Sequence, residues 1–311
     1  MTRRTCLKRW LRRIACLALT VSLVGCSDSN SKPDSQTDSQ PVSVTVKSIR
    51  EQAVDEYLAL IKSTDYCTHA LGEIDGYKYT NSLDALWYSY ERGARLFEAD
   101  IHLTSDGRAV LVHGFEKNDY LKRIGAQYYP DEYEKEDKAY IPTHDEFMSW
   151  RIQGRYQPLD FEMLADFIRA HPDTHVLADV WSQDFEGTKA VYTAMCEACG
   201  YDEAVLCRII AGGHTQEMIR AVKEVYDFPI LNLYFSDEMI DDTFTQEDFI
   251  TYCKSQGIQS FSCADSYCTA ERLAGFEGSG LISYVFTVDD PERARVLKTL
   301  GVDIVGSDVL R

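Results

Sequence analysis

The sequence predicts an α/β fold of the (β/α)₈ TIM-barrel class, and three observations support it. Short apolar runs rich in β-branched and aromatic residues alternate with stretches of helical spacing from residue 47 to residue 311, as in a parallel sheet covered by helices. One pair of runs is separated only by Thr104–Arg108, whose Asp-Gly step is typical of a hairpin. Without the hairpin partner, eight strands remain, the number that closes such a barrel.

The expected strands follow one another along nearly the whole body of the chain. They are Asp65–His69, Arg95–Leu103, Ala109–His113, His175–Trp181, Ala204–Ala211, Pro229–Phe235, Ile258–Ala264, Leu281–Val288 and Asp303–Gly306. The amphipathic stretches between them include Leu159–Ala170, Thr188–Cys199, Thr215–Val225, Gln246–Ser255 and Pro291–Leu300. An open doubly wound sheet is the alternative, but no glycine-rich phosphate loop follows the first strand. The pattern therefore favours the barrel.

The first 46 residues are expected to direct and tether the chain. Residues 1–25 combine a basic stretch with an apolar run, Ile14–Val24, that is too short to span a bilayer but suits a signal peptide. The string Leu23-Val24-Gly25-Cys26 resembles the lipobox of bacterial lipoproteins. This resemblance implies a lipid on Cys26 and an extracytoplasmic position at the cell membrane; the alternative is an ordinary secretory signal with a chance cysteine. Residues 26–46 are mostly small and polar, which indicates a flexible tether.

The charge of the chain excludes one class of partner. The net charge is −18, and removing the six positive side chains of residues 1–25 leaves −24 on the rest. A body this acidic repels nucleic-acid phosphates, so a DNA-binding role is not expected. An anionic substrate would need a local cation, and a bound metal ion is the natural source.

Cysteine spacing offers a weaker indication. Seven cysteines follow Cys26, and an odd number cannot pair completely. Cys196 and Cys199 have CxxC spacing but lie in an expected helix, without a second pair or a histidine at zinc-finger spacing. We therefore expect buried small side chains there rather than a zinc or redox site.

Five polar residues stand at or near the carboxyl ends of expected strands, where barrel enzymes place their chemistry. His69 and His113 end two runs, and Asp179 lies inside an apolar one. Glu98 and Asp100 are two residues apart, so their side chains share one face of a strand. Three converging carboxylates indicate a hard divalent cation, Ca²⁺ or Mg²⁺. The alternative is that Glu98 and Asp100 form the solvated face of an edge strand.

Several short motifs occur in a fixed order along the chain. They are His69-Ala70-Leu71-Gly72, Asn81-Ser82, Gly93–Asp100 with its Glu-Ala-Asp, Thr104–Gly107, Val110–His113, Phe286–Asp289 and Gly301–Asp308. The ordered set resembles the glycerophosphodiester phosphodiesterase family, which reads His-Arg-Gly, Asn-Thr, Gly-Ala with Glu-x-Asp, Thr-x-Asp-Gly, His-Asp, Trp-Thr-Val-Asn and Gly-Val-Asp-Gly-Ile-Ile-Thr-Asp. The resemblance covers residues 65–311.

The resemblance implies a metal-dependent phosphodiesterase. The family's paired histidines correspond to His69 and His113, the acid–base couple. Its metal-binding carboxylates correspond to Glu98, Asp100 and Asp179. It implies hydrolysis of a small or lipid-derived glycerophosphodiester to an alcohol and glycerol phosphate, within a TIM barrel.

The chain departs from the family pattern at three positions. Ala70 and Trp181 stand where the family has an arginine and a lysine, and Gly114 stands where it has an aspartate. Two phosphate-binding cations are therefore missing. Candidate substrate-binding residues that could compensate are Arg208, His102 and His214, with Trp181 as part of a wall.

Two hypotheses follow from these departures. One is an active enzyme with altered specificity, including a phospholipase-like reaction that releases a cyclic phosphate. The other is a catalytically weak lipoprotein that binds phosphorylated ligands. Retention of both histidines and all three acids favours the enzyme. The tyrosine-rich insert 114–158 begins beside His113, where it is expected to be either a lid over the site or a solvated excursion.

Overall fold

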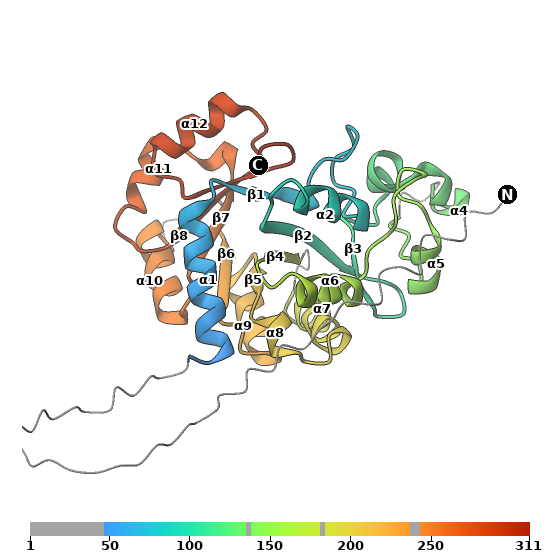
Figure 1. The fold of residues 1–311 in the computed structure, drawn as a ribbon, viewed down its shortest axis with the longest axis horizontal. Helices are drawn as coiled ribbons and strands as arrows, with labels where there is room; N and C mark the ends of the chain where they lie inside the picture. The colour runs from blue at the N-terminus through green and yellow to red at the C-terminus, as the bar shows by residue number, and fades with distance from the viewer. Residues whose placement is uncertain (1–46, 135–137, 181–183, 237–242) are drawn as a thin grey trace, which may run out of the picture. The chain divides into compact units, whose positions relative to one another are not determined.

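Eight parallel strands close into a barrel in the computed structural model, which describes residues 47–134, 138–180, 184–236 and 243–311 (Figure 1). Closure follows because β1 pairs with both β2 and β9. β3 (Ala109–Leu111) runs antiparallel to β2, so the predicted barrel and hairpin are confirmed. The barrel strands are β1 (Tyr66–Thr68), β2 (Leu96–Leu103), β4 (His175–Val180), β5 (Ile209–Gly213), β6 (Ile230–Tyr234), β7 (Ser260–Ala264), β8 (Ile282–Phe286) and β9 (Ile304–Ser307).

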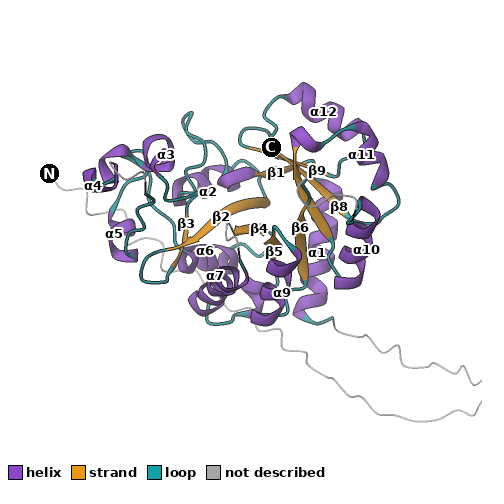
Figure 2. Cartoon of the chain, turned by 180° about the vertical axis from the view of Figure 1, so that it is seen from behind, coloured by secondary structure: helices purple, strands orange, loops and turns teal. Residues whose placement is uncertain are grey.

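Helices connect most of the strands and cover the outside of the barrel (Figure 2). Many begin at a Ser, Thr or Asp whose side chain accepts a hydrogen bond from a backbone N–H of the first turn. Ser48 and Thr245 do so within full capping boxes. None of the helices in the described ranges has the length and apolar character needed to cross a bilayer. The helices are α1 (Ile49–Ser63), α2 (Leu83–Tyr90), α6 (Phe161–Ala170), α7 (Phe185–Ala198), α8 (Glu203–Leu206), α9 (Gln216–Val225), α10 (Gln246–Gln256), α11 (Ala270–Gly275) and α12 (Pro291–Thr299).

One end of the barrel is plugged by α1. Tyr57 of α1 is fully buried in a cluster with apolar side chains from the first halves of the strands, and its hydroxyl lies 3.0 Å from that of Tyr284. His175, at the start of β4, is also buried here, and its Nε2 donates to the carbonyl oxygen of Ala53 at 3.2 Å. The amino-terminal end is therefore closed, which leaves the carboxyl ends of the strands to form the site.

The insert packs through aromatic side chains that join the main hydrophobic core. It contains α3 (Lys117–Asp119), the single-turn π-helix η2 (Tyr120–Ile124), η3 (Ala126–Tyr128), α4 (Asp131–Glu134) and α5 (His144–Ser149). Tyr120 and Phe147 are buried, and each packs against the buried ring of Trp150. Figure 1 shows this segment beside β3. The aromatic residues of the insert are therefore used for packing, while its charged residues lie largely at the surface.

One expected strand is shorter in the structure. The strand expected at Ala204–Ala211 begins only at Ile209, because Asp202 caps the short helix α8 and accepts a hydrogen bond from Ala204 N at 3.0 Å. Cys196 and Cys199 are buried, as expected. The predicted signal peptide (1–25) and tether (26–46), with Cys26, lie outside the described residues.

Candidate active site

The site is a pocket at the carboxyl ends of the strands, and it is open to solvent on one side. Side chains alternate along a strand, so every second residue points into the barrel. On this alternation Glu98 and Asp100 of β2 face the interior, and residues from all the other barrel strands line the pocket with Glu98. They include His69, Glu98, Asp179, His214, Tyr234 and Phe286.

Three acids meet in this pocket. Asp100 and Asp179 are direct neighbours in the pairing of β2 with β4, and Glu98 lies one inward position earlier. One oxygen from each of these carboxylates lies within 4.8 Å of the others. The structure therefore brings together the three acids that the sequence predicted as metal ligands, and they are not the solvated face of an edge strand.

The electrostatics of the triad favour a bound cation. Burial and the neighbouring charge of Asp100 raise the pKa of Glu98 well above its usual range, and burial also raises the pKa of Asp100. Burial also acts on Asp179, but the hydrogen bond from His214 and the charges of the neighbouring histidines together outweigh it and lower the pKa of this carboxyl. The pKa values of both acids are raised even though His69 and His113 favour their charged forms, so a bound cation would supply the further positive charge that keeps both carboxylates ionised.

One oxygen of Glu98 supports the same conclusion. Oε2 of Glu98 accepts a hydrogen bond from Ala70 N at 2.6 Å. Oε1 is buried, and within the described part of the chain it has no hydrogen-bond partner. A buried carboxylate oxygen without a partner is costly. Hard oxygen ligands in this arrangement fit a divalent cation such as Mg²⁺ or Ca²⁺.

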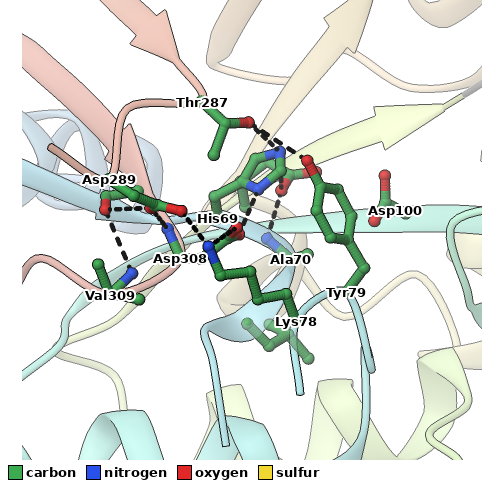
Figure 3. Close-up of polar contacts among 12 residues, drawn as sticks. His69, Ala70, Lys78, Tyr79, Asp100, Thr287, Asp289, Asp308 and Val309 are labelled. Atoms are coloured by element: carbon green, nitrogen blue, oxygen red, sulfur yellow. Dashed lines mark hydrogen bonds and ion pairs between the residues drawn. The ribbon is translucent and has the colours of Figure 1, made fainter. Parts of the chain in front are cut away.

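His69 is held between several groups at the edge of the triad (Figure 3). Its Nδ1 donates to Oδ1 of Asp308 at 2.8 Å. Its Nε2 lies 3.8 Å from Oε2 of Glu98 and 3.3 Å from Oγ1 of Thr287. Burial acts against a charged imidazole, but the charge of Glu98 and the hydrogen bond to Asp308 raise the pKa of His69 to about 9. Asp308 therefore fixes the ring so that Nε2 faces the acids.

His113 is held by the insert. Its Nδ1 donates to Oδ1 of Asp119 at 3.0 Å, and Arg123 pairs with the same carboxylate. A Cβ at residue 114 would lie only 2.6 Å from Oδ2 of Asp119, so Gly114 leaves the room that this carboxylate occupies. Burial opposes a charged ring, but the hydrogen bond to Asp119 and the charge of Asp100 raise the pKa of His113. Each of the two histidines is thus oriented by a carboxylate that accepts a hydrogen bond from its Nδ1.

Tyr79 lies between the two imidazoles. Its ring makes edge-to-face contacts with His69, at 4.9 Å between centroids, and with His113, at 5.2 Å. Tyr79, Ala70 and Asn81 all have positive φ angles, between 45° and 55°, a strained conformation for residues with a side chain. Asn81 uses it to donate from Nδ2 to Oδ2 of Asp100 at 2.7 Å. Strain is therefore concentrated around the acids and the histidines.

Comparison with known proteins agrees with this geometry. The model of the "Glycerophosphoryl diester phosphodiesterase family" matches residues 75–311, more than half of the chain. The chain belongs to this family. No curated protein matches its sequence.

Solved structures of family members share the fold. A putative glycerophosphoryl diester phosphodiesterase from Silicibacter pomeroyi is 18% identical, with a TM-score of 0.64, and the match covers 79% of this chain and 90% of that one. A putative glycerophosphodiester phosphodiesterase from Galdieria sulphuraria is 17% identical, with a TM-score of 0.63 and coverage of 78% and 93%. An Oleispira antarctica phosphodiesterase, solved with the product sn-glycerol-3-phosphate, is 14% identical, with a TM-score of 0.60 and coverage of 80% and 95%.

The four candidate substrate-binding residues have different positions in this family member. His214 lines the pocket, where its Nε2 donates to Oδ1 of Asp179. Arg208 precedes β5 at the closed end of the barrel, where its Nη2 lies 2.9 Å from Oε2 of Glu56, so the structure does not support its expected role at the site. His102 faces the pocket side of β2, but its Nε2 donates to the carbonyl oxygen of His113 at 3.1 Å. Trp181 lies outside the described residues.

Sequence reasoning assigned no role to four residues of the site. Asp308 and Asn81 stood inside quoted motifs but were given none, although a polar residue within a family motif is a usable signal. Tyr79 could have been predicted as a site residue, because it lies two residues before Asn81 of a family motif. No sequence pattern pointed to Asp119. It lies in the insert, as the last residue of α3, and only the fold of the insert brings it to His113.

Proposed function

We propose that this protein is a divalent-metal-dependent glycerophosphodiester phosphodiesterase that uses His69 and His113 as its acid–base pair. One observation carries the proposal: an acid triad within 4.8 Å, with two histidines beside it that are each held by a carboxylate on Nδ1. A protein that only bound phosphorylated ligands would not need two positioned imidazoles. The names of the structural relatives support the substrate class.

Each residue has a definable part in the reaction. Glu98, Asp100 and Asp179 would hold the cation, which when bound stabilises the negative charge that develops on the phosphoryl oxygens. One imidazole removes the proton from the attacking hydroxyl or water, and the other protonates the leaving alkoxide. Their Nδ1 atoms are occupied by Asp308 and Asp119, so Nε2 is the nitrogen available on each ring.

The insert supplies a candidate for one of the missing phosphate-binding cations. The guanidinium of Arg123 lies 4.7 Å over the ring of Tyr79, which itself contacts both histidines. Its partner Asp119 also holds His113, so Arg123 lies beside the proposed acid–base pair. We infer that Arg123 contacts the anionic phosphodiester in place of the arginine replaced by Ala70. Planar guanidinium groups bind phosphoryl oxygens well.

Phosphorus NMR of a metal-supplemented reaction tests the function. With glycerophosphocholine and glycerophosphoethanolamine, the proposal expects a glycerol phosphate signal that needs Mg²⁺, Ca²⁺ or Mn²⁺ and disappears with a chelator. A cyclic phosphate as the final product would instead indicate a lyase. An inert wild type with all three ions would favour the binding protein. His69→Asn and His113→Asn are each expected to reduce kcat by roughly 10²–10⁴-fold, whereas His171→Gln, outside the pocket, keeps it.

We also propose that Cys26 carries a lipid that anchors the enzyme to the outer side of a cell membrane. The support is the basic and apolar segment that precedes Leu23-Val24-Gly25-Cys26, followed by a polar tether. Labelling cells with a fatty-acid analogue should mark the wild type, while Cys26→Ser should lose the label and leave the detergent phase. A wild type without label would reject the anchor.

A further inference from the structure

Two thiols lie in contact at the end of β7. Cys263 is the fourth residue of β7, and Cys268 follows the short helix η4 (Asp265–Tyr267). Their sulfur atoms are 3.2 Å apart, and both side chains are buried, with 2% and 7% of each residue exposed. This distance is shorter than an ordinary contact between two thiols and only about 1 Å longer than a disulfide bond.

The CxxC pair on α7 provides a contrast. Cys199 Sγ donates to the carbonyl oxygen of Cys196 at 3.3 Å, as expected for a small polar group within a helix. Cys263 and Cys268 instead face each other across a turn, with each sulfur atom directed at the other.

The turn that carries Cys268 is fixed by other contacts. Cys268 N donates to the carbonyl oxygen of Asp265 at 3.0 Å. Arg293 of α12 bridges the turn, with Nε donating to Oδ1 of Asp265 at 2.8 Å and Nη2 donating to the carbonyl oxygen of Cys268 at 3.2 Å. The backbone therefore already holds the two thiols together, and bonding them needs only a small movement of the sulfur atoms.

We propose that Cys263 and Cys268 are a modification site, oxidised to an intramolecular disulfide by thiol–disulfide exchange with a disulfide-bearing oxidant. One thiolate attacks the donor disulfide and releases one donor thiol. The second thiolate then displaces the other donor thiol and closes the Cys263–Cys268 bond. Two protein thiols and one donor disulfide become one protein disulfide and two donor thiols, so atoms and electrons balance.

Cys268 is the expected first nucleophile. It lies on the turn that follows β7 and not on the strand itself, so it stays accessible to a donor until the turn closes. Because both sulfurs are largely covered in the folded chain, exchange with a donor should take place while the turn is still open, during folding.

The disulfide would brace one wall of the pocket. Ser262, next to Cys263, lines the pocket together with Tyr234, its pairing partner on β6. The ring of Tyr234 packs 5.0 Å from that of His214 and 6.0 Å from that of Phe286. Fixing the end of β7 therefore limits the movement of side chains that border the triad.

Peptide mapping tests the proposal directly. Cleavage after Lys254 and Arg272 releases residues 255–272, which contain these two cysteines and no others. The full chain is folded with oxidised and reduced glutathione, alkylated under denaturing conditions without reduction, and digested with trypsin. The expected peptide carries no alkyl group, is lighter by two hydrogens than its dithiol form, and takes two alkyl groups after reduction.

Control variants separate this bond from random oxidation. Cys196→Ser should leave the unalkylated peptide unchanged, while Cys268→Ser should leave Cys263 alkylated. The oxidised wild type should melt roughly 5 °C above its reduced form. Two alkylated cysteines in the wild-type peptide, or a disulfide that joins either cysteine to another peptide, would overturn the proposal, and neither result depends on catalytic activity.

Discussion

Nε2 of His214 donates to Oδ1 of Asp179 at 2.7 Å. Asp179 is the most exposed member of the acid triad, so this hydrogen bond restricts the carboxylate that would otherwise move most freely. His214 follows β5 directly, whereas Asp179 lies on β4. Residues from two neighbouring strands therefore fix the orientation of one proposed metal ligand. Groups that orient metal-binding carboxylates in this way strengthen the site without touching the ion.

Replacing His214 should therefore weaken metal binding. For His214→Ala we expect a loss of roughly 10–100-fold in affinity for a divalent ion, measured by titrating the protein with Mn²⁺ and following the free ion by electron paramagnetic resonance. His144→Gln is the matched control, since its Nε2 lies 2.9 Å from a carboxylate oxygen of Asp160, outside the pocket. Equal Mn²⁺ affinity in wild type and His214→Ala would show that Asp179 needs no support.

Asp119 should act as a positioning residue for His113. In Asp119→Asn the imidazole of His113 loses its negatively charged partner, so the pKa of His113 falls. In a plot of kcat against pH, the limb set by the ionisation of His113 therefore moves to lower pH. We expect kcat to fall by roughly 10–100-fold with little change in KM. Asp145→Asn, an exposed change in α5, should alter neither. A lower kcat with an unmoved pH profile would point to a structural role alone.

Arg123 is expected to affect substrate binding more than turnover. Arg123→Ala should raise the KM for a glycerophosphodiester by roughly 10-fold, the effect of losing one charge-assisted contact of about 1.4 kcal/mol. Arg123→Lys should recover part of the loss, because it keeps the charge but not the planar fork. Lys122→Ala, an exposed neighbour, serves as the control. An unchanged KM in Arg123→Ala would remove Arg123 from the phosphate-binding set.

His175 should make the stability of the fold depend on pH. Burial at the closed end of the barrel lowers the pKa of His175 to about 4, from 6.5 in an unfolded chain. At pH 7 the residue is neutral in both states. As pH falls below 6.5 the unfolded state takes up a proton first, so stability is lost until about pH 4, by about 3 kcal/mol.

Urea unfolding of the chelator-treated protein checks this expectation. Between pH 7 and pH 4, the free energy of unfolding should fall by about 3 kcal/mol more in the wild type than in His175→Leu. Other carboxylates titrate in this range in both proteins, so the difference between the two curves isolates His175. Parallel curves would contradict the assignment.

Much of the fold could be predicted because alternation of short apolar runs with helical spacing is a local property. The same alternation placed Glu98 and Asp100 on one inward face, and Asp179 stood out as an acid in an apolar strand. Prediction failed where local signals compete. At Ala204–Ala211 the apolar pattern suits a strand, yet a cap at Asp202 makes the first half a helix, which puts Arg208 at the wrong end of the barrel.

The supporting residues of the site could not be derived from local patterns. His69 and Asp308 are 239 residues apart, and only closure of β1 against β9 brings them together. The position of Asp119 depends on how the insert folds, and the spacing of apolar residues in the sequence does not predict that fold. The loss of an aspartate at Gly114 could be read from the sequence, but its replacement by a carboxylate five residues later could not.

Metal stoichiometry and turnover measured on one preparation test the central claim most directly. The metal-stripped protein is dialysed against Mg²⁺, Ca²⁺ or Mn²⁺, the bound ion is counted, and release of glycerol phosphate is followed in the same sample. We predict about one ion per chain, turnover that rises with its occupancy, and loss of both in Glu98→Gln, which keeps the shape of the side chain but not its charge. Full turnover in the presence of chelator, or unchanged ion binding by Glu98→Gln, would contradict the account.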